Sequence, residues 1–280
     1  MARAGYDGSG SSWIEIVVMD PSQQRSFNQP VRTALSAWFG QGAGRRLLVN
    51  EQQSFAEQLS NLFGYHLLQV GRLSDLDLLA SSRINQRCVL DLGDAVQVPC
   101  PHVCLRGTAS ELPVDSDCID VVVMPHVLEF DPRPHEVLRE AARILVPEGH
   151  LLISVFNPIS LPGIWRLALK HQGGAPWCGH FFTQYRLRDW LELLGFELMT
   201  TQTLFYMPPL GNTRMEHFFE PFDRIGRVLC PLFAGVYILS ARKRSSTLTP
   251  IRPRLAYRQS LVGVSLAGPT SRVSRFDKAS

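Results

Sequence analysis

The sequence lacks any long hydrophobic run. No stretch of about 18 consecutive apolar residues, the minimum for a helix that crosses a bilayer, occurs among the 280 residues. The first dozen residues are rich in Gly and Ser and lack the apolar core of a secretory signal. Hydrophobic residues make up 45% of the chain and charged residues 19%, which is typical of a globular protein. We therefore expect a soluble, cytoplasmic protein built on one main domain.

Paired cysteines are also missing. The six cysteines include no CxxC pair, which structural zinc sites usually need. One compressed cluster, CPHVC, places His102 between Cys100 and Cys104 and is the best candidate for a metal site. Because its spacing does not match the usual ligand sets, we favour reduced thiols and predict no metal.

Acidic residues are scarce near the C-terminal end. Residues 242–280 contain nine Lys or Arg and one acid, Asp277, a net charge of +8. Since the whole chain carries +3, residues 1–241 carry −5. We predict that residues 245–280 are a disordered basic tail, either solvated or weakly bound to nucleic acid or anionic lipid. The acidic body argues against a nucleic-acid enzyme, because a groove for phosphates should be basic.

Short apolar runs alternate with amphipathic segments along the middle of the chain. Residues 119–124, IDVVVM, are typical of a strand buried on both faces, and residues 134–145 have helical spacing. The alternation predicts an α/β fold: a doubly wound, mostly parallel, Rossmann-like sheet of about seven strands whose last hairpin is antiparallel. The other predicted strands are 65–71, 88–92, 102–105, 150–156, 196–205 and 236–242, and the other predicted helices are 30–39, 53–63, 187–194 and, within a polar linker, 73–80.

Five short motifs follow one another in the central block. They are Glu111-Leu112-Pro113, Asp120-Val121-Val122, His126-Val127-Leu128-Glu129, Leu138-Arg139-Glu140 and Pro147-Glu148-Gly149-His150. With these motifs in this order, the chain from 66 to 244 resembles the class I S-adenosylmethionine (SAM)-dependent methyltransferases. The resemblance is to the type 11 group, which includes quinone-biosynthesis C-methyltransferases, and it implies SAM as cofactor and methyl transfer as activity. We divide the chain into an N-terminal extension with helices that pack on the core (1–64), a methyltransferase domain (65–244) and the tail (245–280).

The resemblance implies a cofactor site at the carboxyl ends of the first strands. In the family, glycines after strand one lie against the methionine part of the cofactor. Here that loop reads VGRLS, and Gly71 alone remains of the usual three glycines. An acid at the end of strand two binds the ribose hydroxyls in the family. Asp91 is our first choice and Asp94 the alternative, although either could instead serve the turn at Gly93.

The same resemblance assigns the remaining site residues. Thr108 and Ala109 would flank the adenine, and Met124 and Pro125 would face the sulfonium and the acceptor. His126 is the candidate general base if the acceptor must lose a proton, and its alternative is a structural histidine in the turn after the strand.

An insertion at about 157–185 would cap the acceptor pocket, as in similar enzymes. Its aromatic residues Trp165, Trp177, Phe181 and Phe182 fit a small, hydrophobic acceptor and equally fit ordinary packing. The dipeptide Asn157-Pro158 is similar to the start of an NPPY-type motif but lacks the aromatic residue.

The altered glycine loop leaves two interpretations of the function. Either Gly71 suffices for cofactor binding and the protein is an active methyltransferase, or the pocket is vestigial and the protein is a noncatalytic binding or scaffold protein.

Overall fold

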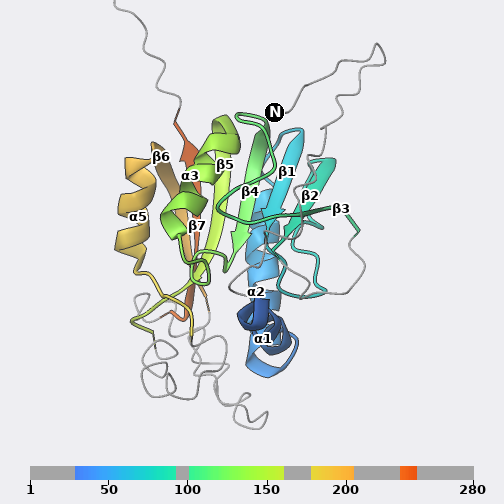
Figure 1. Ribbon diagram of the computed structural model, residues 1–280, viewed down its shortest axis with the longest axis vertical. Helices are drawn as coiled ribbons and strands as arrows, with labels where there is room; N and C mark the ends of the chain where they lie inside the picture. The colour runs from blue at the N-terminus through green and yellow to red at the C-terminus, as the bar shows by residue number, and fades with distance from the viewer. Residues whose placement is uncertain (1–28, 93–100, 161–177, 205–233, 245–280) are drawn as a thin grey trace, which may run out of the picture. The chain divides into compact units, whose positions relative to one another are not determined.

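The protein is built on one seven-stranded sheet (Figure 1). The computed structural model describes residues 29–92, 101–160, 178–204 and 234–244. The basic tail, Asp94, Cys100, Trp165 and Trp177 lie outside the described residues. The strands are β1 (His66–Val70), β2 (Gln86–Asp91), β3 (Val103–Arg106), β4 (Ile119–Pro125), β5 (Leu145–Phe156), β6 (Phe196–Leu204) and β7 (Val236–Lys243). The helices are α1 (Gln29–Phe39), α2 (Gly42–Leu59), α3 (Pro134–Ile144) and α5 (Gln184–Leu193).

The strands lie in the order β3-β2-β1-β4-β5-β7-β6. The first five pair in parallel, and β7 runs antiparallel to both of its neighbours, β5 and β6. The predicted fold class, a mostly parallel sheet with an antiparallel last hairpin, is therefore confirmed. Because β1, β2, β4 and β5 are parallel, their carboxyl ends meet at one edge of the sheet.

Each face of the sheet carries its own hydrophobic layer. Side chains of successive strand residues point to opposite faces, so Leu68 and Val122 pack with α3 and α5 while Leu67 and Val121 pack with α1 and α2. In Figure 1, α3 lies in front of the sheet and α2 behind it, while α5 lies at the left beside β6 and α1 below the strands. Among the described helices, none combines the length and the apolar character needed to span a bilayer.

The connection from β1 to β2 contains no helix, so the prediction of a helix over 73–80 is wrong. Three side chains in this loop bind backbone amides two residues ahead: Ser74 binds Leu76, Asp77 binds Leu79, and Ser82 binds Ile84. Such local bonds give the backbone an alternative to helical hydrogen bonds. The Ser and Asp residues therefore fix a series of turns.

The boundary between the two N-terminal helices also differs from the prediction. Helix α2 begins at Gly42, well before the predicted start at residue 53, and it includes Gly44. A Cβ atom at Gly44 would lie 2.2 Å from the carbonyl oxygen of Trp38 in α1. This glycine is required for the close approach of the two helices and does not break the second one.

The start of β1 is held by a carboxylate from β4. The Oδ2 atom of Asp120 accepts hydrogen bonds from the backbone amides of Tyr65 and His66, at 2.8 and 2.9 Å. A Cβ atom at Gly64 would lie 2.4 Å from the Cβ of Asp120, so the chain can approach this carboxylate only with glycine there. The Asp120 motif found in the sequence thus aligns β1 with β4.

We expect Asp120→Ala to destabilise the protein by about 1 to 3 kcal/mol, because two amides lose a charged acceptor. Denaturant unfolding monitored by circular dichroism measures this change. The exposed Asp189→Ala in α5 is the control, and we expect its effect to stay within about 0.5 kcal/mol. Equal stability of the two variants would show that Asp120 does not anchor β1.

Candidate functional site

Gly71 lies at the carboxyl end of β1, as the sequence predicted. Its φ angle is +82°, and its amide donates to the carbonyl of Leu90 in β2 at 2.8 Å. A Cβ atom here would lie 3.1 Å from Val127 and 3.2 Å from Leu92, so a side chain would be both strained and crowded. The one retained glycine therefore occupies a position where the backbone comes close to Val127 and Leu92.

The two larger residues of the same loop have contacts of their own. The side chain of Arg72 donates from Nε to the carbonyl of Ser74, and Leu73 is 4% exposed within the layer formed by α1 and α2. The Oγ of Ser74 in turn holds the next turn of the loop. Arg72 and Leu73 are thus held by a backbone contact within the loop and by packing in the layer.

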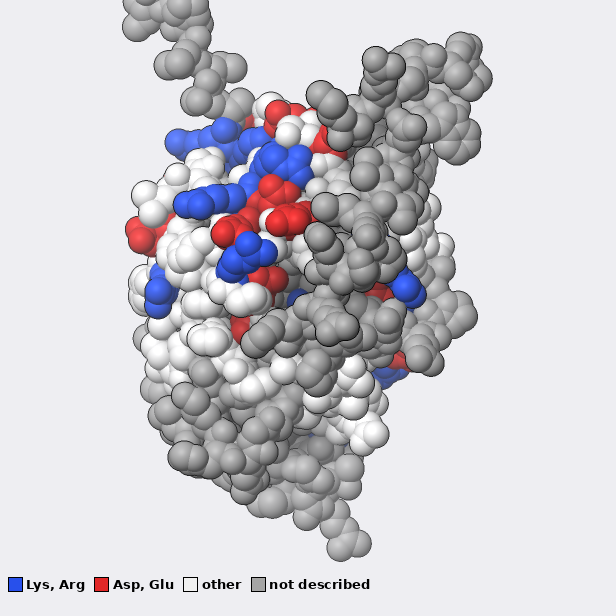
Figure 2. Space-filling model, viewed as in Figure 1, with Lys and Arg blue, Asp and Glu red and all other residues white. Residues whose placement is uncertain are grey.

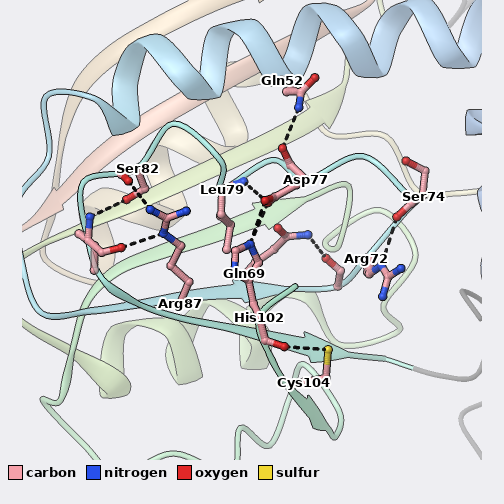
Figure 3. A network of polar contacts seen from close by, with 12 residues as sticks. Gln52, Gln69, Arg72, Ser74, Asp77, Leu79, Ser82, Arg87, His102 and Cys104 are labelled. Atoms are coloured by element: carbon pink, nitrogen blue, oxygen red, sulfur yellow. Dashed lines mark hydrogen bonds and ion pairs between the residues drawn. The ribbon is translucent and has the colours of Figure 1, made fainter. Parts of the chain in front are cut away.

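A polar network fixes the rest of this loop (Figure 3). Asp77 accepts from a ring nitrogen of His102 near β3, and its carbonyl accepts from Gln52 of α2 at 2.7 Å. The network therefore ties three segments together without a crossover helix. It also assigns His102, which the sequence placed in a candidate metal cluster, to a contact with Asp77.

Asp91 is the last residue of β2 and lies next to the end of β1. Gly107, at the start of the loop that holds Thr108 and Ala109, donates its amide to the carbonyl of Asp91 at 3.3 Å. Thr108 forms a short bridge with Glu111, and Ala109 is buried. The structure thus brings the candidate ribose acid and the candidate adenine loop together.

Arg32 of α1 is a charged side chain at this edge that sequence analysis missed. It is 9% exposed, and its Nη1 lies 3.6 Å from the position of a Cβ atom at Gly71. Burial lowers its pKa to about 10, an effect that the carboxylates of Asp131, Asp91 and Glu129 partly offset. Only the packing of α1 brings Arg32 to Gly71, and the sequence contains no motif that signals this.

Met124 and Pro125 end β4 at the same edge. The side chain of Met124 is fully buried in the layer under α3, so only its backbone is available to a ligand. Pro125 pairs in register with Ser154 of β5. These two residues therefore shape the end of the strand and do not project polar groups.

His126 is fully buried between two carboxylates. Its Nε2 lies 2.7 Å from Oε1 of Glu51 in α2, and its Nδ1 lies 2.9 Å from Oε1 of Glu129. Burial by itself would lower the pKa, but the two carboxylates outweigh it and raise the pKa of His126 to about 10. With both ring nitrogens engaged by carboxylates, His126 directs no free nitrogen at an acceptor, so this geometry supports the structural alternative to the general-base prediction.

The carboxylates of Glu51 and Glu129 can accept hydrogen bonds beyond those with His126. Glu129 Oε1 also accepts from the amide of Phe156 at the end of β5, at 2.8 Å. The Oε2 atoms of Glu51 and Glu129 are buried and have no hydrogen-bond partner among the described residues. The sequence motif identified Glu129, whereas the charge pattern of α2 gave no reason to single out Glu51.

The aromatic residues expected to cap an acceptor pocket pack inside the protein where they are described. Phe182 is 8% exposed in the layer under α5, and Phe181 stacks on Phe156 with ring centroids 5.2 Å apart. Asn157 donates from its side chain to the carbonyl of Ala234 and so joins the end of β5 to the start of β7. These residues act in packing and give no support to an NPPY-type motif.

Charged side chains at the opposite edge of the sheet pair with each other. Glu197 binds both Arg242 and Arg244, and Lys243 lies 2.7 Å from Asp117. On the face shown in Figure 2, described Lys and Arg side chains accordingly lie beside Asp and Glu. This mixed charge is unlike the one-sign surface of a phosphate groove.

The raised pKa of His126 predicts a pH-dependent stability. The pKa is about 6.5 in the unfolded chain and about 10 in the folded protein. The stabilisation is therefore complete below about pH 6.5 and is lost as the pH rises through about 10. We expect His126→Gln to remove a slope of up to about 1.4 kcal/mol per pH unit in this window.

Urea unfolding of wild type and His126→Gln at several pH values from 6.5 to 10 measures the two slopes. Glu51→Gln, which removes one of the two carboxylates, should reduce the slope in the same direction. A slope unchanged in His126→Gln would show that this histidine is not protonated in the folded state.

A family model of the methyltransferase domain matches residues 79–153, which span β2 to β5. Over 191 residues the chain is 34% identical to the uncharacterized protein YafS of Escherichia coli K12, an alignment that covers 68% of this chain and 73% of that protein.

Solved structures share the fold. A SAM-dependent methyltransferase of Thermotoga maritima superposes with a TM-score of 0.53 at 17% identity, covering 78% of this chain and 98% of that chain. One from Archaeoglobus fulgidus gives 0.51 at 20% identity, covering 71% and 94%. The [4+2]-cyclase SpnF gives 0.50 at 18% identity, covering 78% and 92%. The chain belongs to the type 11 class I SAM-dependent methyltransferases, in one family with YafS.

Proposed function

We propose that the protein transfers the methyl group of SAM to a small-molecule acceptor, with the cofactor at the carboxyl edge of β1, β2 and β4. The observation that supports this most directly is the group formed by Gly71, Asp91 and Arg32, which come from three separate elements. Gly71 retains the required backbone conformation, and the two charged side chains lie at the same edge. SAM supplies an electrophilic methyl group, and the residues of the protein bind and orient the cofactor.

The polar atoms at this edge suit the parts of the cofactor. The carboxylate of Asp91 is partly exposed and can accept from both ribose hydroxyls. The buried guanidinium of Arg32 can bind the methionine carboxylate near Gly71. Thr108 and Ala109 lie in the loop beside Asp91 and would flank the adenine, and the backbone at Met124 and Pro125 would border the methyl group.

Positioning accounts for most of the rate enhancement in such a displacement, because no covalent intermediate on the protein is required. His126 contributes by holding the turn after β4 through Glu51 and Glu129. We therefore assign it a positioning role and not the role of base. The fold also occurs in the [4+2]-cyclase SpnF, so an experiment must test cofactor binding directly.

Titration with SAM and with S-adenosylhomocysteine should raise the melting temperature, because a ligand of the folded state stabilises it by mass action. We expect Asp91→Ala to weaken binding by roughly 10- to 150-fold, the loss of about 1.5 to 3 kcal/mol. Isothermal titration calorimetry measures the affinity. The matched variant Asp94→Ala should bind as wild type does, and the reverse result would move the ribose ligand to Asp94.

Arg32→Met removes the charge but keeps an unbranched side chain of similar reach. We expect it to weaken binding of SAM and S-adenosylhomocysteine by at least 10-fold while adenosine, which has no methionine carboxylate, binds as before. Competition of the three ligands in the same calorimetric assay measures this difference. If the affinity for adenosine fell equally, Arg32 would support the structure of the site and would not bind the methionine carboxylate. Absence of SAM binding by the wild type would favour the noncatalytic binding protein.

A further inference from the structure

Gln69 is a buried polar side chain that the proposed function does not use. It is the last residue but one of β1, is 4% exposed and pairs in register with Val89 of β2 and Val123 of β4. Both valines belong to the apolar layer under α1 and α2, so a hydrophobic residue is the usual choice at such a position. A carboxamide buried there needs a hydrogen-bond partner, because burial without one costs free energy.

The partner of Gln69 is the loop glycine at the proposed cofactor edge. Nε2 of Gln69 donates to the carbonyl oxygen of Gly71 at 2.8 Å, and this contact is buried. The amide of Gly71 donates to the carbonyl of Leu90 in β2, also at 2.8 Å. Both backbone polar groups of Gly71 are therefore bound, one by a neighbouring strand and the other by a side chain. Figure 3 shows the side chain of Gln69 beside this loop.

The hydrogen bond from Gln69 sets the orientation of the peptide between Gly71 and Arg72. A peptide group is planar, so a contact that holds its C=O also fixes the direction of its N–H. Glycine by itself adopts many backbone conformations, and Gly71 has a φ angle of +82°. A contact from outside the backbone is therefore needed to select one conformation of this loop, and Gln69 provides it.

We propose that Gln69 is a positioning residue for the cofactor, because its hydrogen bond to Gly71 holds the loop in the conformation that receives the methionine part of SAM. This inference rests on the proposed function, in which Gly71 and Arg32 lie at that part of the cofactor. Nη1 of Arg32 lies 3.6 Å from the position of a Cβ atom at Gly71. A shift of the Gly71 backbone therefore changes the space between this backbone and the guanidinium.

The adenosine part of the proposed site is held by other contacts. The amide of Gly107, which precedes the candidate adenine loop, donates to the carbonyl of Asp91. This contact is separate from the hydrogen bond of Gln69 to Gly71. Loss of the Gln69 hydrogen bond should therefore weaken the binding of SAM and leave the binding of adenosine unchanged.

Gln69→Met tests the hydrogen bond, because Met has a similar length and no donor. We expect this variant to bind SAM and S-adenosylhomocysteine roughly five- to tenfold more weakly than the wild type, the loss of about one hydrogen bond. We expect it to bind adenosine as the wild type does. Isothermal titration calorimetry measures the three affinities. Unchanged affinity for SAM, or an equal loss for adenosine, would overturn the proposal.

Val123→Ala is the matched control, because Val123 is fully buried and pairs with Gln69 in the sheet. It should lower the free energy of unfolding, as large-to-small substitutions in a core do. It should also keep the wild-type ratio of the affinities for SAM and adenosine. If Val123→Ala changed this ratio as Gln69→Met does, the effect would follow from a weakened core and the proposal would fail.

Gln69→Glu provides a rescue that depends on pH. A protonated carboxyl group can donate to the carbonyl of Gly71, whereas a carboxylate has no proton to donate. Burial raises the pKa of a carboxyl group, so the variant should bind S-adenosylhomocysteine nearly as the wild type does at about pH 5 and about tenfold more weakly at about pH 9. Wild type in the same buffers is the reference. A ratio of the two affinities that does not change with pH would contradict the donor role of residue 69.

The affinity of the wild type for SAM separates this inference from the proposed function. If the wild type binds SAM and Gln69→Met binds it equally well, the role of Gln69 is refuted and the proposed methyl transfer stands. If the wild type binds no SAM, the proposed function fails and the positioning role fails with it.

Discussion

The contact of His126 with Glu51 and Glu129 connects three segments at the carboxyl edge of the sheet. It joins α2 to the turn after β4, and through the amide of Phe156 it also reaches the end of β5. The backbone of His126 has a φ of +47°, a conformation that costs a non-glycine residue roughly 1 to 3 kcal/mol. Ion pairs on both sides of the ring hold this residue in place. The turn after β4 is therefore held by buried polar contacts of His126 with two carboxylates.

The N-terminal helices α1 and α2 cover the face of the sheet beside β1 and β2, where no crossover helix lies between these two strands. The 71–85 connection consists of turns held by Ser and Asp side chains, so no helix follows β1. Instead, α1 brings the guanidinium of Arg32 to Gly71, and α2 brings Glu51 to His126. The N-terminal helices thus place charged side chains next to the altered glycine loop and next to the turn after β4.

The aromatic residues of the predicted cap contribute to packing where they are described. Phe181 and Phe182 pack against other rings. A long positively charged surface is not seen on the described face in Figure 2, where charges of both signs alternate.

The sequence by itself determined the sheet, because β-branched runs such as residues 119–124 and the spacing of residues 134–145 are local patterns with a fixed period. It also placed Gly71 directly after the first strand and Asp91 at the end of the second, where the structure has them. It could not predict that Arg32 and Glu51 reach this edge, because each lies on a helix whose orientation is set by packing with distant strands. Tertiary structure alone decided the surroundings of His126, because one of its two carboxylate partners, Glu51, lies 75 residues earlier in the chain and the other, Glu129, three residues later.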